Sequence, residues 1–257
     1  MAKIIAIANQ KGGVGKTTTS VNLTAILADM GQRVLAVDLD PQGNTTSGLG
    51  MTVEDKSVYE AVMGRIGLKE AVQHTDIPGL DLVGADIRLA GAELELVSVD
   101  KREFRLKTAL AAVQKDYDFI FIDCPPSLSL LTLNALTAAD RVLVPIQCEY
   151  YALEGLSDLL STIRIVKGRL NPAIRLEGLL LTMYDGRTNL SMQVAEEVKR
   201  HFPGQVFATV IPRNVRLSEA PSHGKPVNAY DGSSRGSVAY KRLTEEFLKQ
   251  NPLERKE

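Results

Sequence analysis

The sequence predicts an α/β fold with a single doubly wound, mostly parallel β-sheet flanked by helices. Three observations support this. Short aliphatic runs, typical of strands buried on both faces, alternate with segments of helical periodicity along the chain. The first run is followed by a glycine-rich turn and a helical segment, as in a βαβ unit with a right-handed crossover. The 257 residues contain no linker, repeat or low-complexity tract, so residues 1–257 are expected to form one domain.

The individual elements follow from these runs in chain order. The second apolar run ends in Asp-Leu-Asp-Pro at residues 38–41, and a later run with Phe-Ile-Phe-Ile at its centre ends at Asp123. Strands are expected at residues 3–8, 33–37, 118–123, 141–146, 176–183 and 206–211. Helices are expected at residues 17–30, 102–113, 128–138, 153–170, 190–201 and 237–250. Residues 41–56 and 213–236 are expected to be loops, and residues 57–114 show short helical patterns.

The composition is that of a soluble globular protein with an aliphatic core. Hydrophobic residues make up 44% of the chain but aromatic residues only 5%, and tryptophan is absent, so aliphatic side chains must fill the interior. Cys124 and Cys148 are too few for a disulfide framework and are expected to be reduced and buried. No signal peptide is visible, and no stretch approaches the ~20 apolar residues that span a bilayer. We therefore expect a cytoplasmic protein.

The charges are unevenly distributed. The formal net charge of -1 excludes a uniformly basic nucleic-acid binder. Residues 1–160 contain 14 basic and 21 acidic side chains, whereas residues 161–257 contain 16 and 10. A basic last third indicates either a surface that faces a polyanion or helices solvated by lysine and arginine, and composition alone favours neither.

The glycine-rich turn at residues 9–18 is a phosphate-binding loop. The usual pattern needs a glycine at position 10, where Gln10 stands, but Gly15-Lys16-Thr17 matches its second half. Glycines before Lys16 let backbone N–H groups turn towards phosphate oxygens, and the following helix offers its N-terminus to the same anion. Lys16 would reach the β- and γ-phosphates of ATP, and Thr17 would bind Mg²⁺. The expected nucleotide-binding residues of the loop are Lys11, Gly12, Gly13, Val14, Gly15, Lys16, Thr17 and Thr18.

The sequence resembles a known family. A Lys-Gly-Gly-x-Gly-Lys-Thr loop, here at residues 11–17, is similar to the deviant Walker A motif of the ParA/MinD group of ATPases. Four further stretches resemble the chromosomal ParA proteins called Soj, and the resemblance runs from about residue 3 to residue 240. They are residues 38–44 (DLDPQGN), 121–127 (FIDCPPS), 147–155 (QCEYYALEG) and 211–226 (IPRNVRLSEAPSHGKP).

Three aspartates end neighbouring predicted strands. Asp123 fits a carboxylate near Mg²⁺, and Asp38 and Asp40 are alternate residues that can converge on one site. The resemblance implies that Asp40 orients or deprotonates the attacking water, while Asp38 supports the metal shell. For both Asp38 and Asp40, a helix-capping or turn-capping role is the structural alternative.

The resemblance also implies an ATP-dependent homodimer. Lys11 would cross to the nucleotide of a second subunit and neutralise charge in the transition state, and Gly12 would stay small where the two backbones approach. The catalytic residues would be Lys11, Lys16 and Asp40. Pro212 and Asn214 would contact adenine, although a rigid turn is the structural alternative for this segment.

The resemblance further implies DNA segregation. Arg187 and Arg216 match positions that bind DNA in Soj-like proteins, by contacts to phosphates without sequence specificity. A wider patch could include Arg164, Lys167, Lys199, Arg200 and Arg213. A ParB-type protein would stimulate hydrolysis and reset the dimer to monomers, and the protein would associate with the nucleoid.

Three relatives with other properties remain for comparison. MinD-like ATPases attach to membranes through an amphipathic C-terminal helix, but residues 240–257 mix acids with bases and contain Pro252. The nitrogenase iron protein shares a cluster between subunits, but Cys124 and Cys148 are not spaced for one. Larger plasmid ParA proteins carry an N-terminal helix-turn-helix domain, which is not expected here because residue 11 already belongs to the loop.

Overall fold

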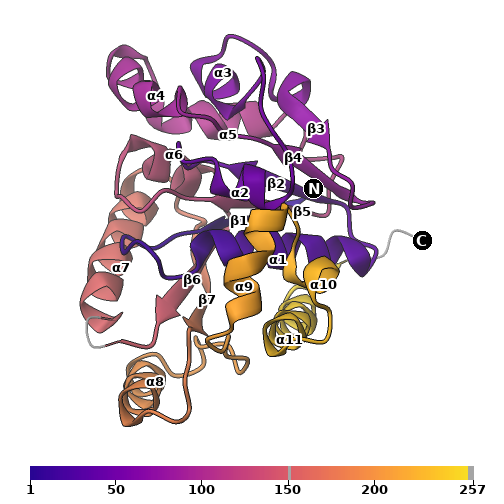
Figure 1. Ribbon diagram of the computed structural model, residues 1–257. Helices are drawn as coiled ribbons and strands as arrows, with labels where there is room; N and C mark the ends of the chain where they lie inside the picture. Colours follow the sequence, from indigo (N-terminus) through magenta and orange to yellow (C-terminus); the bar gives the residue numbers. More distant parts are fainter. Residues whose placement is uncertain (150–151, 254–257) are drawn as a thin grey trace.

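The computed structural model describes residues 1–149 and 152–253, without the side chains of residues 152–154. Its centre is a seven-stranded sheet in the order β3-β4-β2-β5-β1-β6-β7, with helices on both faces (Figure 1). Neighbouring strands are parallel except β3 and β4. The strands are β1 (Lys3–Ile7), β2 (Val34–Asp38), β3 (Val72–His74), β4 (Leu80–Val83), β5 (Phe119–Asp123), β6 (Arg141–Gln147) and β7 (Arg175–Thr182). The predicted doubly wound α/β fold is confirmed.

Helices connect the strands and cover both faces of the sheet. They are α1 (Lys16–Asp29), α2 (Asn44–Gly48), α3 (Val58–Met63), α4 (Leu89–Glu95), α5 (Arg105–Leu110), α6 (Leu130–Ala138), α7 (Ala152–Arg169), α8 (Asn189–His201), α9 (Val215–Glu219), α10 (Val227–Tyr230) and α11 (Arg235–Gln250). The described part of the chain contains no helix with the length and apolarity of a membrane span. As predicted, α1 stops before Gly31, whose φ of 84° is the left-handed conformation that commonly ends a helix.

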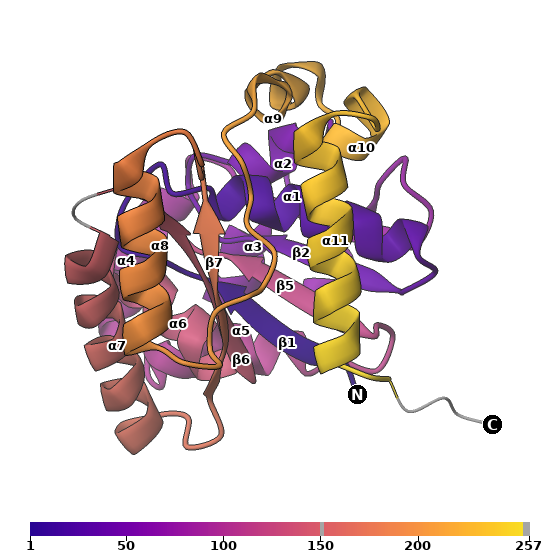
Figure 2. The same ribbon diagram turned by 90° about the horizontal axis from the view of Figure 1, so that it is seen from below.

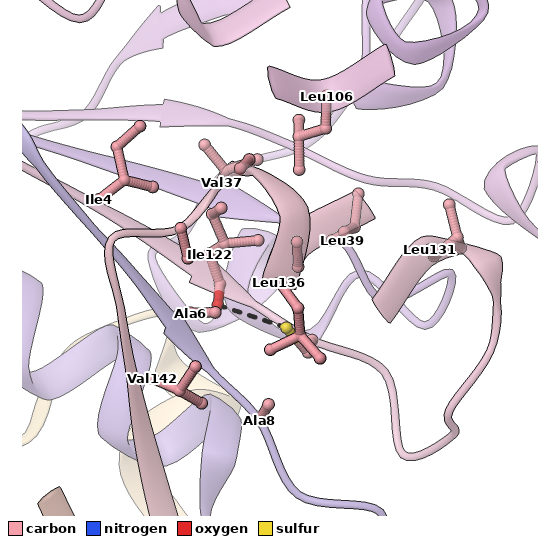
Figure 3. Close-up of a cluster of buried hydrophobic side chains, with 14 of the residues drawn as sticks. Ile4, Ala6, Ala8, Val37, Leu39, Leu106, Ile122, Leu131, Leu136 and Val142 are labelled. Atoms are coloured by element: carbon pink, nitrogen blue, oxygen red, sulfur yellow. Dashed lines mark hydrogen bonds between the residues drawn. The ribbon is translucent and has the colours of Figure 1, made fainter. Parts of the chain in front are cut away.

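Two apolar layers hold the helices against the sheet. Successive side chains of a strand point to opposite faces, so Ile4 and Ala6 of β1 join one cluster and Ile5 and Ile7 join the other. The first cluster contains side chains of α3 to α8, and Figure 3 shows part of it around Ala6. The second contains side chains of α1 and α11, and Figure 2 shows α11 lying across the sheet. The core is mainly aliphatic, as its composition requires.

The strand predicted at residues 206–211 is wrong as a continuous element. Two isolated bridges, Leu179–Val206 and Tyr184–Pro212, join this part of the chain to β7 and its end, and the N–H of Ile211 donates to the carbonyl oxygen of Leu181 at 2.8 Å. The cause lies in α11, because Glu246 accepts hydrogen bonds from the backbone N–H groups of Ala208 and Thr209 at 2.6 and 2.9 Å. The N–H groups of these two residues therefore donate to a side chain and not to the neighbouring strand.

Four other sequence predictions need correction. Residues 57–114 contain two strands, β3 and β4, which are too short at three and four residues for periodicity to distinguish them from helical patterns. The helix expected at 102–113 is shorter, since a 3₁₀ turn precedes α5 and the helix ends at Leu110. The loop at 41–56 contains α2, and the loop at 213–236 contains α9 and α10. These short helices depend on tertiary contacts that local propensity does not reveal.

Gly178 of β7 is required by packing rather than by backbone conformation. A Cβ atom there would lie 2.6 Å from Cε2 of Phe207, a side chain that is 1% exposed. We expect Gly178→Ala to lower the free energy of unfolding by about 1–3 kcal/mol, because the ring must move. Gly168→Ala in α7 is the matched control, since no atom of the described residues outside its own helical backbone lies within 4 Å of its Cβ position. Urea denaturation of both variants and of the parent measures the effect. Equal free energies of unfolding for Gly178→Ala and Gly168→Ala would contradict the prediction.

Candidate active site

The loop between β1 and α1 lies at the carboxyl edge of the sheet. Gly13 and Gly15 have φ angles of 73° and 89°, which are unfavourable for residues with a side chain. Thr182 fixes the loop from β7 by donating its hydroxyl hydrogen to the carbonyl oxygen of Val14 at 2.8 Å. Among the described residues, no side chain caps the N-terminus of α1. Its first N–H groups therefore remain available to an anion.

The two lysines of the loop point to different partners. Lys16 is 6% exposed and donates to the carbonyl oxygen of Lys11 at 3.2 Å. Burial lowers the pKa of Lys16, and the charge of Asp123 partly opposes this shift. The ammonium of Lys11 lies 3.3 Å from Oε2 of Glu149, with about a third of its side chain exposed (35%). The side chain of Lys16 therefore lies in the interior of the loop, whereas that of Lys11 lies at its solvent-exposed rim.

Asp38 and Asp123 lie side by side at the ends of β2 and β5. The two residues are register partners, and both are fully buried. Oδ2 of Asp123 accepts hydrogen bonds from the hydroxyl groups of Thr17 at 2.8 Å and Thr45 at 2.7 Å. Oδ1 of Asp123 has no hydrogen-bond partner among the described residues. A buried carboxylate oxygen without a partner is costly unless a bound group satisfies it.

Asp38 and Asp40 both hold backbone groups of the loop that follows β2. Oδ2 of Asp38 accepts from the N–H and hydroxyl groups of Thr46 at 2.8 and 2.7 Å, and Oδ1 accepts from the N–H of Asp40. Asp40 is 7% exposed and accepts from the N–H of Gln42 at 2.9 Å. The turn-capping role that the sequence left open for both residues is thus present. The carboxylate of Asp40 also lies near the phosphate loop, where its charge has a small raising effect on the pKa of Lys16.

The two buried carboxylates have raised pKa values. Burial and, second, the charge of the neighbouring Asp38 raise the pKa of Asp123 to about 7, against the lowering effect of the hydrogen bonds from Thr45 and Thr17. Burial likewise raises the pKa of Asp38 to about 6, against the hydrogen bonds of Thr46. The pair therefore carries less than its full negative charge at neutral pH, and a bound cation would favour the ionised forms.

A cavity of about 310 Å³ adjoins the loop on the side of the predicted adenine contacts. Pro212 and Asn214 both border it, together with Thr18 at the start of α1. The side chain of Asn214 also caps α9 by accepting from the N–H of Arg216 at 3.0 Å. The remaining lining residues are Gly15, Thr182, Met183, Ile211, Arg213, Leu217, Ser218, Pro221 and Tyr240. The structure thus brings the predicted base contacts next to the loop.

A second cavity, of about 870 Å³, has four arginines among its lining residues. They are Arg187, Arg213, Arg235 and Arg242. Arg187 is exposed and forms an ion pair with Asp185 at 2.8 Å. Arg216 lies just beyond this lining and is held by Glu219 at 2.7 Å and by Asp231 at 3.2 Å. The weaker candidates Arg164 and Lys167 border a separate cavity of about 350 Å³. Lys199 and Arg200 lie in the last turn of α8.

Several residues of the site were missed by the sequence analysis. Thr45, Thr46 and Glu149 contact predicted site residues, and Arg235 and Arg242 complete the basic cavity. Two threonines after Asp40 in a loop-like segment were the available signal. Both cysteines are free and buried, as predicted. Residues 150 and 151 of the motif at 147–155 and residues 254–257 of the tail lie outside the described residues.

Comparison with known proteins places the chain in a family. The family described as AAA domain matches residues 2–176. The sporulation initiation inhibitor protein Soj of Bacillus subtilis is 60% identical over 248 residues, which cover 96% of this chain and 98% of that protein. The chain belongs to the ParA/Soj family of chromosome-partitioning ATPases. The chromosome partitioning protein ParA of Myxococcus xanthus, a second member, is 54% identical and covers 98% of this chain and 89% of its own length.

A solved structure with a different name shares the ParA/Soj architecture. Cobyrinic acid a,c-diamide synthase from Mycobacterium smegmatis, with a bound ATP analogue and magnesium, has a TM-score of 0.85 and 41% identity. The match covers 97% of this chain and 95% of that one. Identity to Soj is higher at nearly the same coverage, so the partitioning relatives decide the ParA/Soj assignment.

Proposed function

We propose that the protein is an ATP hydrolase that switches a DNA-partitioning dimer between DNA-bound and free states. The observation that carries the proposal is the convergence of Lys16, Thr17, Asp38 and Asp123 beside an uncapped helix N-terminus, with Asp40 on the adjoining loop. Phosphoryl transfer needs this combination of cations, N–H donors and carboxylates. Residues 1–257 act in this proposal as one ATPase domain.

ATP would lie along the loop with its base in the adjoining cavity. The free N–H groups of α1 and the glycines of residues 12–15 suit the phosphates, and Lys16 adds positive charge at the β- and γ-phosphates. Pro212 and Asn214 border the space for adenine. The named Mycobacterium structure, which holds an ATP analogue and magnesium in the same fold, supports this assignment.

The residues present fit Mg²⁺. Oδ1 of Asp123, which has no partner among the described residues, and the hydroxyl group of Thr17 are hard oxygen donors, and Asp38 supplies a second carboxylate beside them. A bound magnesium ion would neutralise charge on the β- and γ-phosphates. The chain itself supplies the proton acceptor: Asp40 orients a water molecule and takes its proton as the oxygen attacks the γ-phosphorus. ADP and phosphate leave as products.

Dimerisation would complete this site. Lys11 points to the rim of the loop rather than to the interior that Lys16 occupies, so it suits contact with the nucleotide of a second subunit. Among the described residues, only Pro126 lies near the Cβ position of Gly12, at 3.8 Å, which leaves room for a close approach of another chain. Two ATP molecules would then lie between two protomers, and hydrolysis would return the dimer to monomers.

DNA would bind to the arginines around the larger cavity and to Arg216. Arg187, Arg213, Arg235 and Arg242 present guanidinium groups on one surface, as phosphate contacts require. One such surface binds weakly, and a dimer carries two, so avidity links DNA binding to ATP. A ParB-type partner would stimulate hydrolysis, as the partitioning relatives suggest, and the protein would lie on the nucleoid in the cytoplasm.

Arg216→Glu is expected to weaken DNA binding by at least about tenfold at moderate salt while ATP-dependent dimers still form. The slope of log affinity against log salt should become less steep by about 2, because each dimer loses two phosphate contacts. Filter binding or fluorescence anisotropy measures this. Arg65→Glu is the matched control, since Arg65 is also exposed and paired, with Glu95 at 2.9 Å, near α3 and α4.

A variant that frees Arg216 instead of removing it tests whether the charge of Arg216 acts on DNA or only stabilises the fold. Glu219→Gln removes the carboxylate that holds Arg216 at 2.7 Å, and should tighten DNA binding by up to about fivefold, the range of one exposed ion pair. If Arg216→Glu abolished dimers and DNA binding together, Arg216 would have a folding role instead.

Two assays test the proposal as a whole against the MinD-like alternative. ATPase activity is measured alone, with DNA, with a ParB-type protein, and with both, and we expect a synergistic rise with both. Pelleting with DNA or with liposomes in the presence of ATP then distinguishes the two kinds of surface. ATP-dependent pelleting with liposomes and not with DNA would replace partitioning with a membrane-positioning role.

A further inference from the structure

Two consecutive threonines of α2 hold the two buried carboxylates of the site. The hydroxyl of Thr45 donates to Oδ2 of Asp123 at 2.7 Å, and the hydroxyl of Thr46 donates to Oδ2 of Asp38 at 2.7 Å. Thr45 is 0% exposed and Thr46 is 4% exposed. Helix α2 begins four residues after Asp40, so these bonds attach the loop that carries Asp40 to the ends of two strands.

The bond from Thr45 matters because, in the part of the chain that the structure describes, only one oxygen of Asp123 has hydrogen-bond partners. Oδ2 accepts from both Thr17 and Thr45, while Oδ1 is buried and has no partner among residues 1–149 and 152–253. A carboxylate rotates easily about its last bond unless its partners fix it. Thr17 comes from α1 and Thr45 from α2, so the two donors hold Oδ2 from two separate elements.

We propose that Thr45 is a positioning residue, which fixes the carboxylate of Asp123 for Mg²⁺ and couples it to the Asp40 loop. This inference rests on the proposed ATP site. Loss of the hydroxyl frees Asp123 to rotate and detaches α2 from β5. Groups that orient a metal ligand typically change metal affinity by about 10- to 100-fold when removed.

Thr45→Val tests the proposal, because valine keeps the volume and removes the hydroxyl. The first measurement is the affinity for a fluorescent ADP with and without Mg²⁺, at several magnesium concentrations. We expect that the magnesium concentration that gives half of the increase in ADP affinity rises by about tenfold. The affinity for ADP in EDTA should change little. Thr45→Ser, which retains the hydroxyl, should restore the parent value.

The matched control is Thr137→Val in α6. Thr137 is also 0% exposed, but its hydroxyl has no hydrogen-bond partner among the described residues. The substitution is therefore equally conservative in volume and burial but breaks no bond. It should leave the magnesium dependence unchanged.

A second measurement needs no nucleotide. Hydrogen exchange of the amides in α2 should be at least about fivefold faster in nucleotide-free Thr45→Val than in the parent or in Thr45→Ser. Unchanged magnesium dependence together with unchanged exchange in a folded variant would overturn the proposal. If the parent protein itself failed to bind ADP with Mg²⁺, the ATP site would be wrong, and exchange in α2 would still show whether Thr45 anchors the loop.

Discussion

Lys11→Ala is expected to lower ATP hydrolysis by about 10³-fold, the effect of removing a cation that a neighbouring subunit supplies to the transition state. Binding of ATP to the single chain should change little, because Lys16 rather than Lys11 occupies the interior of the loop. Steady-state phosphate release and nucleotide titration measure the two quantities separately. Lys56→Ala is the matched control, since Lys56 is an exposed lysine that pairs with Glu70 at 3.5 Å.

A mixing experiment shows whether Lys11 acts across the dimer. Asp40→Ala is also expected to be inactive, but Asp40 is proposed to act on the nucleotide of its own chain. In a mixed dimer, the Lys11→Ala subunit keeps its own Asp40 and receives Lys11 from its partner, so one of the two sites is complete. Random pairing makes about half of the dimers mixed, and the mixture should recover about a quarter of the parent activity.

If Lys11 acts within its own chain, the expected activity of the mixture is different. If Lys11 acted on its own nucleotide, each site of the mixed dimer would lack one residue, and the mixture would stay inactive. Size measurements with ATP provide the second check, because Asp40→Ala should accumulate as a dimer that cannot hydrolyse its nucleotide. A chain that stayed monomeric with ATP in the Asp40→Ala background would rule out the sandwich mechanism.

The sequence was most informative where local chemistry dictates local structure. The phosphate loop could be predicted because its glycines, Lys16 and Thr17 are adjacent in the chain and lie between a strand and a helix. The positions of Asp38 and Asp123 could be predicted because continuous aliphatic runs define the ends of central strands. Family resemblance, rather than periodicity, supplied the adenine and DNA contacts.

The rest depends on contacts between distant parts of the chain. The pairing of Lys11 with Glu149 joins residues 138 positions apart, and that of Thr45 with Asp123 joins residues 78 apart. The interrupted pairing near Ala208 results from Glu246 in α11, which no local pattern around residue 208 could indicate. Such contacts follow from the packed fold, so sequence reasoning identified the strands and the loop but not the bonds that join them.

The nucleotide-free protein is expected to lose stability as the pH rises from 5 to 7.5. Asp123 and Asp38 have pKa values near 7 and 6 in the folded chain, above those of an unfolded aspartate. At pH values between the unfolded pKa and the folded pKa of each aspartate, the folded state binds more protons than the unfolded state. Raising the pH through this range therefore favours unfolding. The expected loss is roughly 2–4 kcal/mol over this range, measured by urea denaturation at several pH values.

Two variants assign this loss to the buried pair. Asp123→Asn keeps the shape of the side chain but cannot ionise, so it should remove more than half of the pH dependence and make the nucleotide-free chain more stable at pH 7.5. Asp118→Asn is the control with the opposite sign. Arg33 lowers the pKa of Asp118, whose stabilising effect is therefore fully present above the unfolded pKa. That variant should be less stable by a constant amount from pH 5 to 7.5.

The same linkage gives an expectation for nucleotide binding. A cation held by the two carboxylates favours their ionised forms, so binding of ADP with Mg²⁺ near pH 7 should release protons. Calorimetry in two buffers of different ionisation enthalpy measures that release, and Asp123→Asn should reduce it. Stability that rose from pH 5 to 7.5, with no proton release on binding, would contradict the raised pKa values. In the proposed mechanism, the negative charge that destabilises the empty site at neutral pH is the charge that would hold Mg²⁺, which is a reason for a folded chain to keep two buried aspartates side by side.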